Sequence, residues 1–177
     1  AILTGRPGTG KTHLACALAA RAKEEGYSAL FTSVAKIVRN IRDTWGGNGS
    51  EKAAIDAYVD VDLLIIDEVG VQVGSENEQL LLFSVLNARY EKMRPTFLLS
   101  NLNTKGVEKV IGERAMDRLR ENGGIPISFD WESYRTKAVM QALPEQKNKL
   151  LKTEVFADDA VHPKGLGSAF ERSEAID

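Results

Sequence analysis

Eight residues near the start of the chain carry the clearest chemical pattern in the sequence. From Gly5 to Thr12 they read G-x-x-x-x-G-K-T, the pattern of a phosphate-binding loop or P-loop. The glycines let backbone N–H groups turn inward around a phosphate, the lysine reaches the β- and γ-phosphates, and the threonine hydroxyl is a ligand for Mg²⁺. An apolar, strand-like stretch precedes the loop and a helical stretch follows it, which argues against a chance match. The predicted nucleotide-binding residues are Gly5, Pro7, Gly8, Thr9, Gly10, Lys11, Thr12 and His13.

An acidic pair, Asp67 and Glu68, follows the apolar run at 63–67. An aspartate at this point can hold the water shell of Mg²⁺ together with Thr12, and a glutamate one residue later can orient or deprotonate an attacking water. The alternative is an acidic pair that merely ends a strand. The P-loop upstream favours the catalytic interpretation. A water-activating glutamate beside the metal carboxylate also favours hydrolysis over phosphoryl transfer to a small molecule.

The elements that must position these residues alternate along the chain. Continuous apolar runs with helical stretches between them predict an α/β fold, a parallel sheet with helices on both faces. In such sheets ligands bind at the carboxyl ends of the strands, where the P-loop and the acidic pair both lie. Pro126 suits an edge strand. The predicted strands are 1–4, 28–32, 63–67, 96–100 and 125–129, and the predicted helices are 11–25, 34–45, 51–59, 75–92, 104–111 and 113–121.

Three further polar residues are candidates for the same chemistry. Asn101 follows the fourth predicted strand, where it could contact the γ-phosphate or, alternatively, cap a turn. Arg114 and Arg118 are four residues apart and share one helix face. An arginine finger from a neighbouring subunit would use such a residue. Spacing alone favours a solvated helix with Glu/Arg pairs.

A basic stripe on the predicted helix 34–45 is a candidate nucleic-acid contact. Lys36, Arg39 and Arg42 lie opposite its apolar face, where they could contact the phosphates of single-stranded DNA. On charge alone, a solvated outer face is favoured. Trp45 continues the apolar stripe, so we expect it in the core. Ser75 opens a capping box for the following helix.

Composition limits the class of protein. The net charge is −2 and the pI is near 5.8, so any nucleic-acid site must be local. Cys16 is the single cysteine, which excludes an internal disulfide and suggests a cytoplasmic protein. The apolar runs are too short to span a membrane. We expect an ATPase core over 1–136 and an extension over 137–177 that is partly helical or disordered. The chain starts inside a predicted strand, as in a domain cut from a longer protein.

Taken together, the motifs resemble the AAA+ ATPase domain of DnaC-type bacterial helicase loaders. The resemblance covers roughly three-quarters of the chain. The P-loop and the acidic motif are generic, whereas the last two matching stretches are more specific. The matching stretches are Gly5–Ala15, Val61–Gln72, Arg94–Asn101, Gly112–Arg120 and Phe129–Arg135.

The resemblance implies an ATP- and Mg²⁺-dependent AAA+ P-loop NTPase with a five-stranded parallel sheet and no complete helical lid. Lys11 and Glu68 would be catalytic, Asn101 the first sensor and Arg118 the likelier arginine finger, with Arg114 beside it. Subunits would form an open, spiral or ring-like assembly on a hexameric DnaB-type helicase. The helix pair 34–59 and the loop around Ser75 would lie near the channel for single-stranded DNA.

Two departures from the family are expected. The helicase-binding segment, which lies upstream of the ATPase domain in the family, is absent, and a second-sensor arginine is predicted to be missing. Two alternatives stay open. A transposition helper ATPase of the IstB type shares the P-loop, the Asp-Glu pair and the S-Y-R string. A nucleotide-dependent binding switch with negligible turnover is disfavoured by Glu68.

Overall fold

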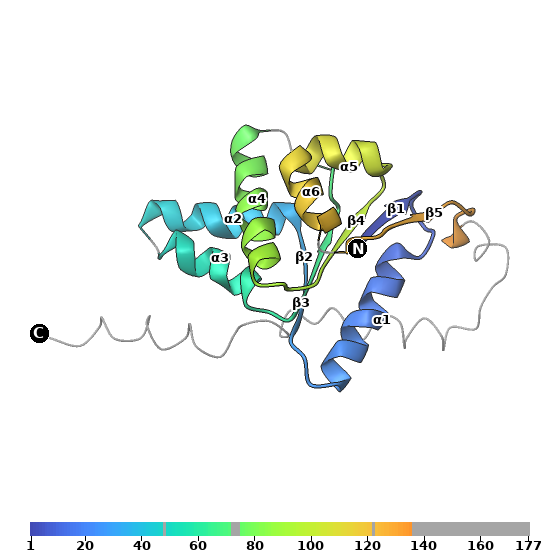
Figure 1. Ribbon diagram of the computed structural model, residues 1–177, viewed down its shortest axis with the longest axis horizontal. Coiled ribbons are helices and arrows are strands. Elements are labelled where there is room, and N and C mark those ends of the chain that lie inside the picture. Colours follow the sequence, from blue (N-terminus) through green and yellow to red (C-terminus); the bar gives the residue numbers. More distant parts are fainter. Residues whose placement is uncertain (48, 72–74, 122, 136–177) are drawn as a thin grey trace, which may run out of the picture. The chain divides into compact units, whose positions relative to one another are not determined.

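The computed structural model describes residues 1–135 apart from 48, 72–74 and 122 (Figure 1). The predicted extension 137–177 lies outside the described residues. The strands are β1 (Ile2–Gly5), β2 (Ala29–Ser33), β3 (Leu63–Asp67), β4 (Thr96–Ser100) and β5 (Pro126–Phe129). The helices are α1 (Lys11–Glu24), α2 (Val34–Arg42), the 3-10 turn η1 (Asp43–Gly46), α3 (Glu51–Val59), α4 (Glu76–Glu91), α5 (Thr104–Ile111) and α6 (Glu113–Glu121).

The five strands form one parallel sheet in the order β2-β3-β4-β1-β5. This order confirms the predicted AAA+ P-loop fold. It places β4 between β1, which leads into the P-loop, and β3, which ends at Asp67. The edge position of β5 explains how the sheet accepts Pro126, which has no N–H to donate to a ladder. The described part of the chain contains no helical lid.

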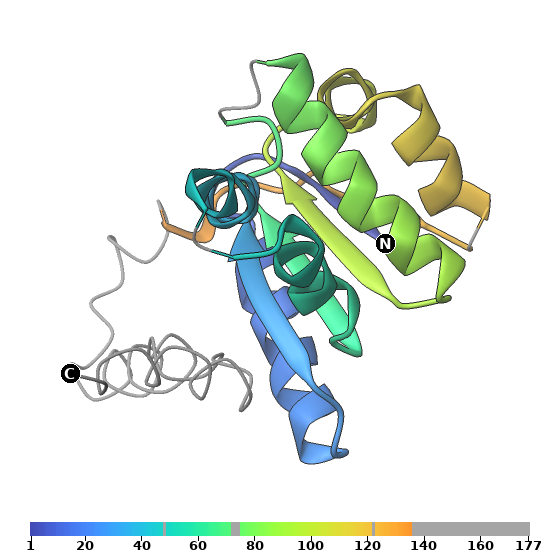
Figure 2. The ribbon, with the colours of Figure 1, turned by 90° about the vertical axis from the view of Figure 1, so that its left-hand side faces the viewer.

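The two faces of the sheet are covered differently. Alternate residues of β3 point to opposite sides, so that Leu64 and Ile66 pack under α2 to α6 while Ile65 packs against Ala15 and Ala19 of α1. Figure 2 shows α4 and α6 together on one side of the sheet and α1 on the other. The small alanine side chains let α1 approach the strands closely, which brings its first turn against the carboxyl end of β1.

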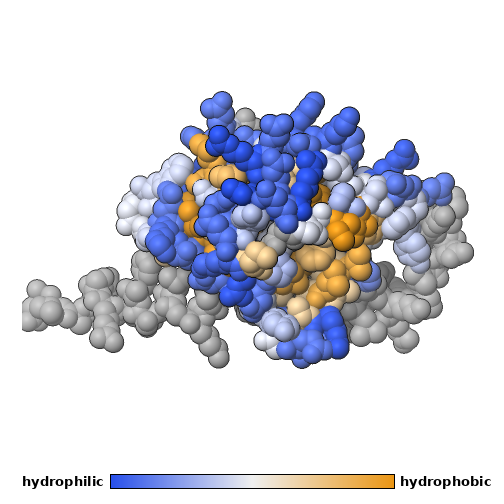
Figure 3. Space-filling view, viewed as in Figure 1, coloured by the Kyte–Doolittle hydropathy of each residue, from blue (hydrophilic) through white to orange (hydrophobic). Residues whose placement is uncertain are grey.

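The surface over α2 to α6 is mostly hydrophilic (Figure 3). Leu14 and Leu18 of α1 and Leu80 of α4 are exposed apolar side chains. No helix in the described ranges combines the length and the apolar character needed to cross a membrane.

Serine side chains cap the starts of several helices, as the sequence predicts for Ser75. The hydroxyls of Ser33 and Ser75 accept hydrogen bonds from the third backbone N–H of α2 and α4, at 3.4 and 3.3 Å. The predicted helix 34–45 is wrong at its end, because α2 stops at Arg42 and tightens into η1. A 3-10 turn has three residues per turn, so the apolar stripe loses its register. Trp45 is therefore 55% exposed, not buried as expected, and donates to Glu51.

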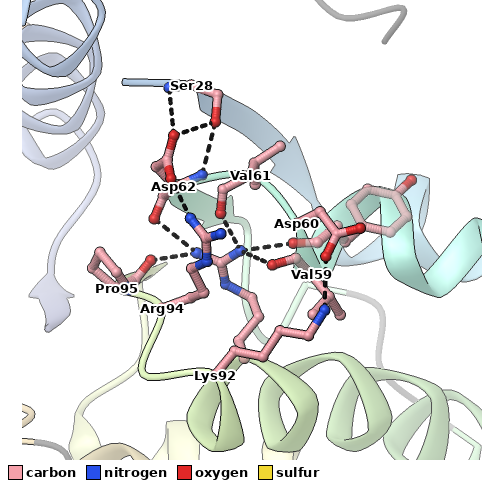
Figure 4. Close-up of polar contacts among 10 residues, drawn as sticks. Ser28, Val59, Asp60, Val61, Asp62, Lys92, Arg94 and Pro95 are labelled. Atoms are coloured by element: carbon pink, nitrogen blue, oxygen red, sulfur yellow. Dashed lines mark hydrogen bonds and ion pairs between the residues drawn. The ribbon is translucent and has the colours of Figure 1, made fainter. Parts of the chain in front are cut away.

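At the amino ends of the strands, the guanidinium of Arg89 is completely buried. Figure 4 shows the carbonyls of Val59, Val61 and Pro95 converging in this region. The Arg89 guanidinium donates to all three at 2.6–3.1 Å. Its Nε atom donates to the Thr96 hydroxyl at 2.9 Å, and further bonds reach the carbonyls of Tyr58 and Asp62. One side chain thus joins α4, the end of α3 and the starts of β3 and β4.

Burial lowers the pKa of Arg89 to about 10, which still leaves it charged near neutral pH. Within the described residues, five backbone carbonyls and the Thr96 hydroxyl accept its hydrogen bonds, and no carboxylate does. The nearby carboxylate of Asp62 instead pairs with Arg94 and accepts from Ser28 (Figure 4). The sequence alone did not predict this cluster.

Candidate nucleotide-binding site

The predicted P-loop connects β1 to α1. Gly5, Gly8 and Gly10 have φ values of +137°, +80° and +98°, a region that side-chain-bearing residues rarely adopt. At Gly5 a Cβ atom would also lie only 2.4 Å from the Phe129 carbonyl oxygen of β5. Gly10 is the N-cap of α1 and supplies no capping side chain, so the positive end of the helix faces the loop.

Lys11 lies beneath this loop and is only 6% exposed. Its Nζ atom donates to the carbonyls of Gly5 at 2.7 Å and Arg6 at 2.9 Å. Burial lowers the pKa of Lys11, and the carboxylate of Asp67 partly opposes that change. The ammonium is therefore already desolvated and held at the place where a phosphate would sit.

Thr12 and Asp67 come together although 55 residues separate them in the chain. The Thr12 hydroxyl donates to Asp67 Oδ2 at 3.0 Å. A hydroxyl and a carboxylate are the oxygen ligands that Mg²⁺ accepts while it keeps several waters. The two predicted metal ligands therefore form a donor set that fits Mg²⁺.

Glu68 is exposed beside this pair. Its backbone φ is +59°, an uncommon value for a residue other than glycine, and its N–H donates to Asp67 Oδ1 at 2.7 Å. The left-handed backbone turns the chain sharply out of β3, which directs the Glu68 side chain to the surface. Sequence reasoning found Glu68 but not its backbone strain.

Asn101 follows β4, between the strands that carry the P-loop and Asp67. It is exposed, whereas the preceding Ser100 is buried. The Ser100 hydroxyl donates to the Val69 carbonyl at 2.5 Å and accepts from the Leu102 N–H at 3.0 Å. Ser100 thus ties the loop after β3 to the turn that presents Asn101.

The remaining predicted loop residues lie on the same surface. Thr9 is buried and its hydroxyl donates to the Arg6 carbonyl at 2.8 Å, which closes the loop on itself. Pro7 and His13 are exposed on either side. The residues proposed for nucleotide binding thus form one continuous loop and the first turn of α1.

Of the two candidate arginines of α6, Arg118 lies away from the chain's own P-loop. Arg118 stacks on the Tyr90 ring at 4.6 Å and pairs with Glu121 at 3.2 Å. It lines a groove with Ala1 and Thr96, at the amino ends of β1 and β4, whereas the P-loop lies at their carboxyl ends. Arg114 is exposed one turn earlier in α6.

The basic stripe of α2 borders a groove beside Glu68. Lys36 and Arg39 are exposed, but Arg42 pairs with Glu78 at 3.2 Å and donates to the Ser75 hydroxyl at 3.5 Å. Arg39, Arg42, Asp43, Glu68 and Glu78 all line this groove. Its charge is therefore mixed rather than uniformly basic.

Sequence reasoning did not anticipate that residues 129–135 pack on the P-loop. The Trp131 indole N–H donates to the Thr9 carbonyl, and the Tyr134 N–H donates to the Gly8 carbonyl, both at 2.9 Å. Arg135 is close enough to lower the pKa of Lys11, although burial is the larger cause. Arg135 therefore lies near the phosphate loop, a position that its place in the sequence did not predict.

Comparisons with known proteins agree with this geometry. The chain is 39% identical over 137 residues to the replicative helicase loader DnaC of Escherichia coli K12, an alignment that covers 77% of this chain and 56% of that protein. The structure of AMPPCP-bound DnaA from Aquifex aeolicus has a TM-score of 0.65 and 27% identity, with coverage of 84% and 44%. A crystal structure of the DnaC helicase loader has a TM-score of 0.62 and 19% identity, with coverage of 74% and 77%.

The chain spans about half the length of the curated relatives it matches. The resemblance to DnaC-type loaders inferred from the motifs is confirmed by these alignments. The sequence profile of the IstB-like ATP binding protein family matches residues 1–142, which is most of the chain. Together with the parallel sheet and the P-loop geometry, this match shows that the chain belongs to the IstB-like family of AAA+ ATP-binding proteins.

Proposed function

We propose that the chain binds ATP with Mg²⁺ and hydrolyses the γ-phosphate. The approach of Thr12 to within 3.0 Å of Asp67, directly before Glu68, carries the proposal. Lys11 would exchange its loop carbonyls for the β- and γ-phosphates, and Thr12 and Asp67 would hold the metal, which supplies charge neutralisation. Glu68 would accept a proton from the attacking water. Asn101 would contact the γ-phosphate from the neighbouring strand.

The position of Arg118 supports the proposal that hydrolysis takes place at an interface between copies of the chain. The strands are five residues long or shorter, about 13–17 Å at the usual rise per residue, and Arg118 lies at the opposite end from the P-loop. It is poorly placed to reach its own nucleotide. In a homo-oligomer, Arg118 or Arg114 of one subunit would instead reach the nucleotide of the neighbouring subunit and act there as an arginine finger.

The biological role we propose is loading a hexameric DnaB-type replicative helicase onto single-stranded DNA in the cytoplasm during replication initiation. The identity to DnaC of Escherichia coli supports this role. The helicase contact would use a segment outside this sequence. Lys36 and Arg39, which are exposed, would contact DNA phosphates, with Arg42 and Ser75 joining if the Glu78 pair opens.

A mixing experiment tests the shared site. Lys11→Ala removes the phosphate ligand but keeps the finger, and Arg118→Ala removes the finger but keeps the P-loop. Each variant alone should lose DNA-stimulated ATPase activity, and an equimolar mixture should recover part of it. Arg120→Ala, an exposed residue of the same helix, is the matched control and should keep full activity. If Arg118→Ala is fully active while Arg114→Ala is inactive, the finger is Arg114.

A transposition helper ATPase is the second candidate, because the family profile that matches is that of IstB-like proteins. Both candidates would share the ATP site and differ in the partner. A pull-down with the full-length protein separates them. Retention of a DnaB-type helicase supports the loader, and retention of a transposase with no helicase supports the helper.

A further inference from the structure

The order of the strands indicates on which side of the P-loop the γ-phosphate and the nucleoside of a bound nucleotide would lie. Asp67 and Glu68 follow β3 and Asn101 follows β4, and both strands lie on the same side of β1. The groups proposed to act on the γ-phosphate therefore stand on that side of the P-loop. Since the loop cradles the middle of the triphosphate, the nucleoside end must leave toward the other side, where β5 is the neighbouring strand.

The segment after β5 occupies that side. It runs beside the turn between β1 and α1 (Figure 1), and its contacts with the loop are close. A Cβ atom on Gly8 would lie 2.1 Å from the Ser133 hydroxyl, so the two segments touch without room for a side chain. The segment is therefore a fixed wall of the site.

The hydrogen bonds from this wall also orient the P-loop backbone. The Gly8 and Thr9 carbonyls point outward, to the Tyr134 N–H and the Trp131 indole. In a trans peptide the N–H points opposite to the carbonyl, so the N–H groups of Thr9 and Gly10 are directed to the inner side of the loop. Two of the phosphate-binding donors are thus preset by the wall.

Two aromatic rings of the wall remain open to solvent. Trp131 is 55% exposed and Tyr134 is 65% exposed, although the polar edge of Trp131 is bonded to the loop. The Trp131 ring also packs on Phe129, with centroids 4.8 Å apart, which steadies its orientation. A fixed, accessible aromatic surface next to a phosphate loop is suited to stacking on a base.

We propose that Trp131 and Tyr134 form an aromatic shelf that binds the purine base and ribose of the nucleotide. This inference rests on the proposed function, because it requires the triphosphate to occupy the P-loop. The shelf would add affinity that a base-free polyphosphate cannot use. Trp131 would have a second role as a positioning residue, through its bond to the Thr9 carbonyl.

The test compares two ligands by calorimetry: Mg-ATP and Mg-tripolyphosphate, which has the phosphates but no base. Tyr134→Ala should weaken ATP binding by about tenfold, as loss of a stacked ring does, and leave tripolyphosphate binding unchanged. Tyr134→Phe should restore ATP binding. Tyr27→Ala is the matched control, because Tyr27 is 60% exposed beyond the far end of the 14-residue helix α1, about 20 Å from the P-loop.

The tryptophan gives an optical readout of the same site. The chain has two tryptophans, so Trp45→Phe leaves Trp131 as the sole reporter. Its fluorescence should change on adding ATP and stay constant on adding tripolyphosphate. Equal weakening of both ligands by Tyr134→Ala, or no weakening of either, would overturn the shelf. If the unmodified protein bound neither ligand, the proposed ATP site itself would be wrong.

Discussion

Two cations in this molecule are surrounded by backbone carbonyls, one at each end of the sheet. At the carboxyl ends, the Lys11 ammonium donates to two carbonyls of a glycine-rich loop. At the amino ends, the Arg89 guanidinium donates to five carbonyls and a hydroxyl from helix ends and strand starts. The Lys11 partners belong to a loop that a phosphate can enter, whereas the Arg89 partners are held by regular structure. At the carboxyl ends of the strands, Lys11 can therefore exchange its carbonyl partners for a phosphate. At the amino ends, the same kind of hydrogen bond holds helices and strands together around Arg89.

The largest effect we expect is a loss of stability from a substitution at the amino ends of the strands. Arg89→Met should lower the free energy of unfolding by about 3–5 kcal/mol, because several buried carbonyls lose their donor. Urea denaturation measures this change. Arg94→Met is the control, and it should change stability far less because its pair with Asp62 is partly exposed. If Arg89→Met lowered the free energy of unfolding by less than Arg94→Met does, the hydrogen bonds from Arg89 to the carbonyls would not contribute to stability.

At the carboxyl ends of the strands we expect a substitution to change ATP turnover and leave stability unchanged. Glu68→Gln should reduce ATP turnover by at least about 100-fold, since the general base is lost. Stability should stay the same because the Glu68 side chain is exposed. Bound nucleotide should accumulate as ATP, which rapid filtration and chromatography can measure. Unchanged turnover would favour a binding switch in which Glu68 has no catalytic role.

A smaller effect is expected from relieving backbone strain, which occurs once at each end of the sheet. Glu68 and Met93 are the two non-glycine residues with positive φ among those the structure describes, at +59° and +54°. Met93 follows α4 at the amino end, in a helix-ending turn closed by bonds to Tyr90 and Arg89. Met93→Gly should raise stability by about 1 kcal/mol. Thermal unfolding measures it, with ATPase activity unaffected.

Glu68→Gly is the matched variant at the carboxyl end. It should relieve similar backbone strain but abolish turnover, because the strained residue is also the proposed general base. Stabilisation by Met93→Gly without stabilisation by Glu68→Gly would show that the Glu68 conformation is supported by contacts beyond its own backbone.

The smallest effect concerns acid stability at the amino end. Hydrogen bonds from Ser28, followed by the pairing with Arg94, lower the pKa of Asp62 below its ordinary value. Its carboxylate therefore contributes stability above pH 4, and that contribution is lost as the pH falls through the lowered pKa. Asp62→Asn should be less stable than the unmodified protein at pH 7, and the difference should shrink toward pH 3. A difference that does not vary with pH would contradict this origin.

Local pattern was sufficient for much of the fold and for the centre of the site. Gly5 to Thr12 identified the P-loop, and the apolar run ending at Asp67 identified the strand that brings Asp67 to Thr12. The capping box at Ser75 marked the start of α4 to within a residue. These predictions succeeded because glycine conformations, helix caps and strand hydrophobicity act between residues that are close in the chain.

Only the tertiary structure decided which distant residues meet. It placed Trp131 on the Thr9 carbonyl across 122 residues and paired Arg42 with Glu78. It also enclosed Arg89 in carbonyls from the end of α3 and from the residues just before β3 and β4. It also exposed Trp45, because α2 ended one turn early. Such contacts depend on strand order and on how the helix ends pack, and neither property is encoded in the spacing of residues along one element.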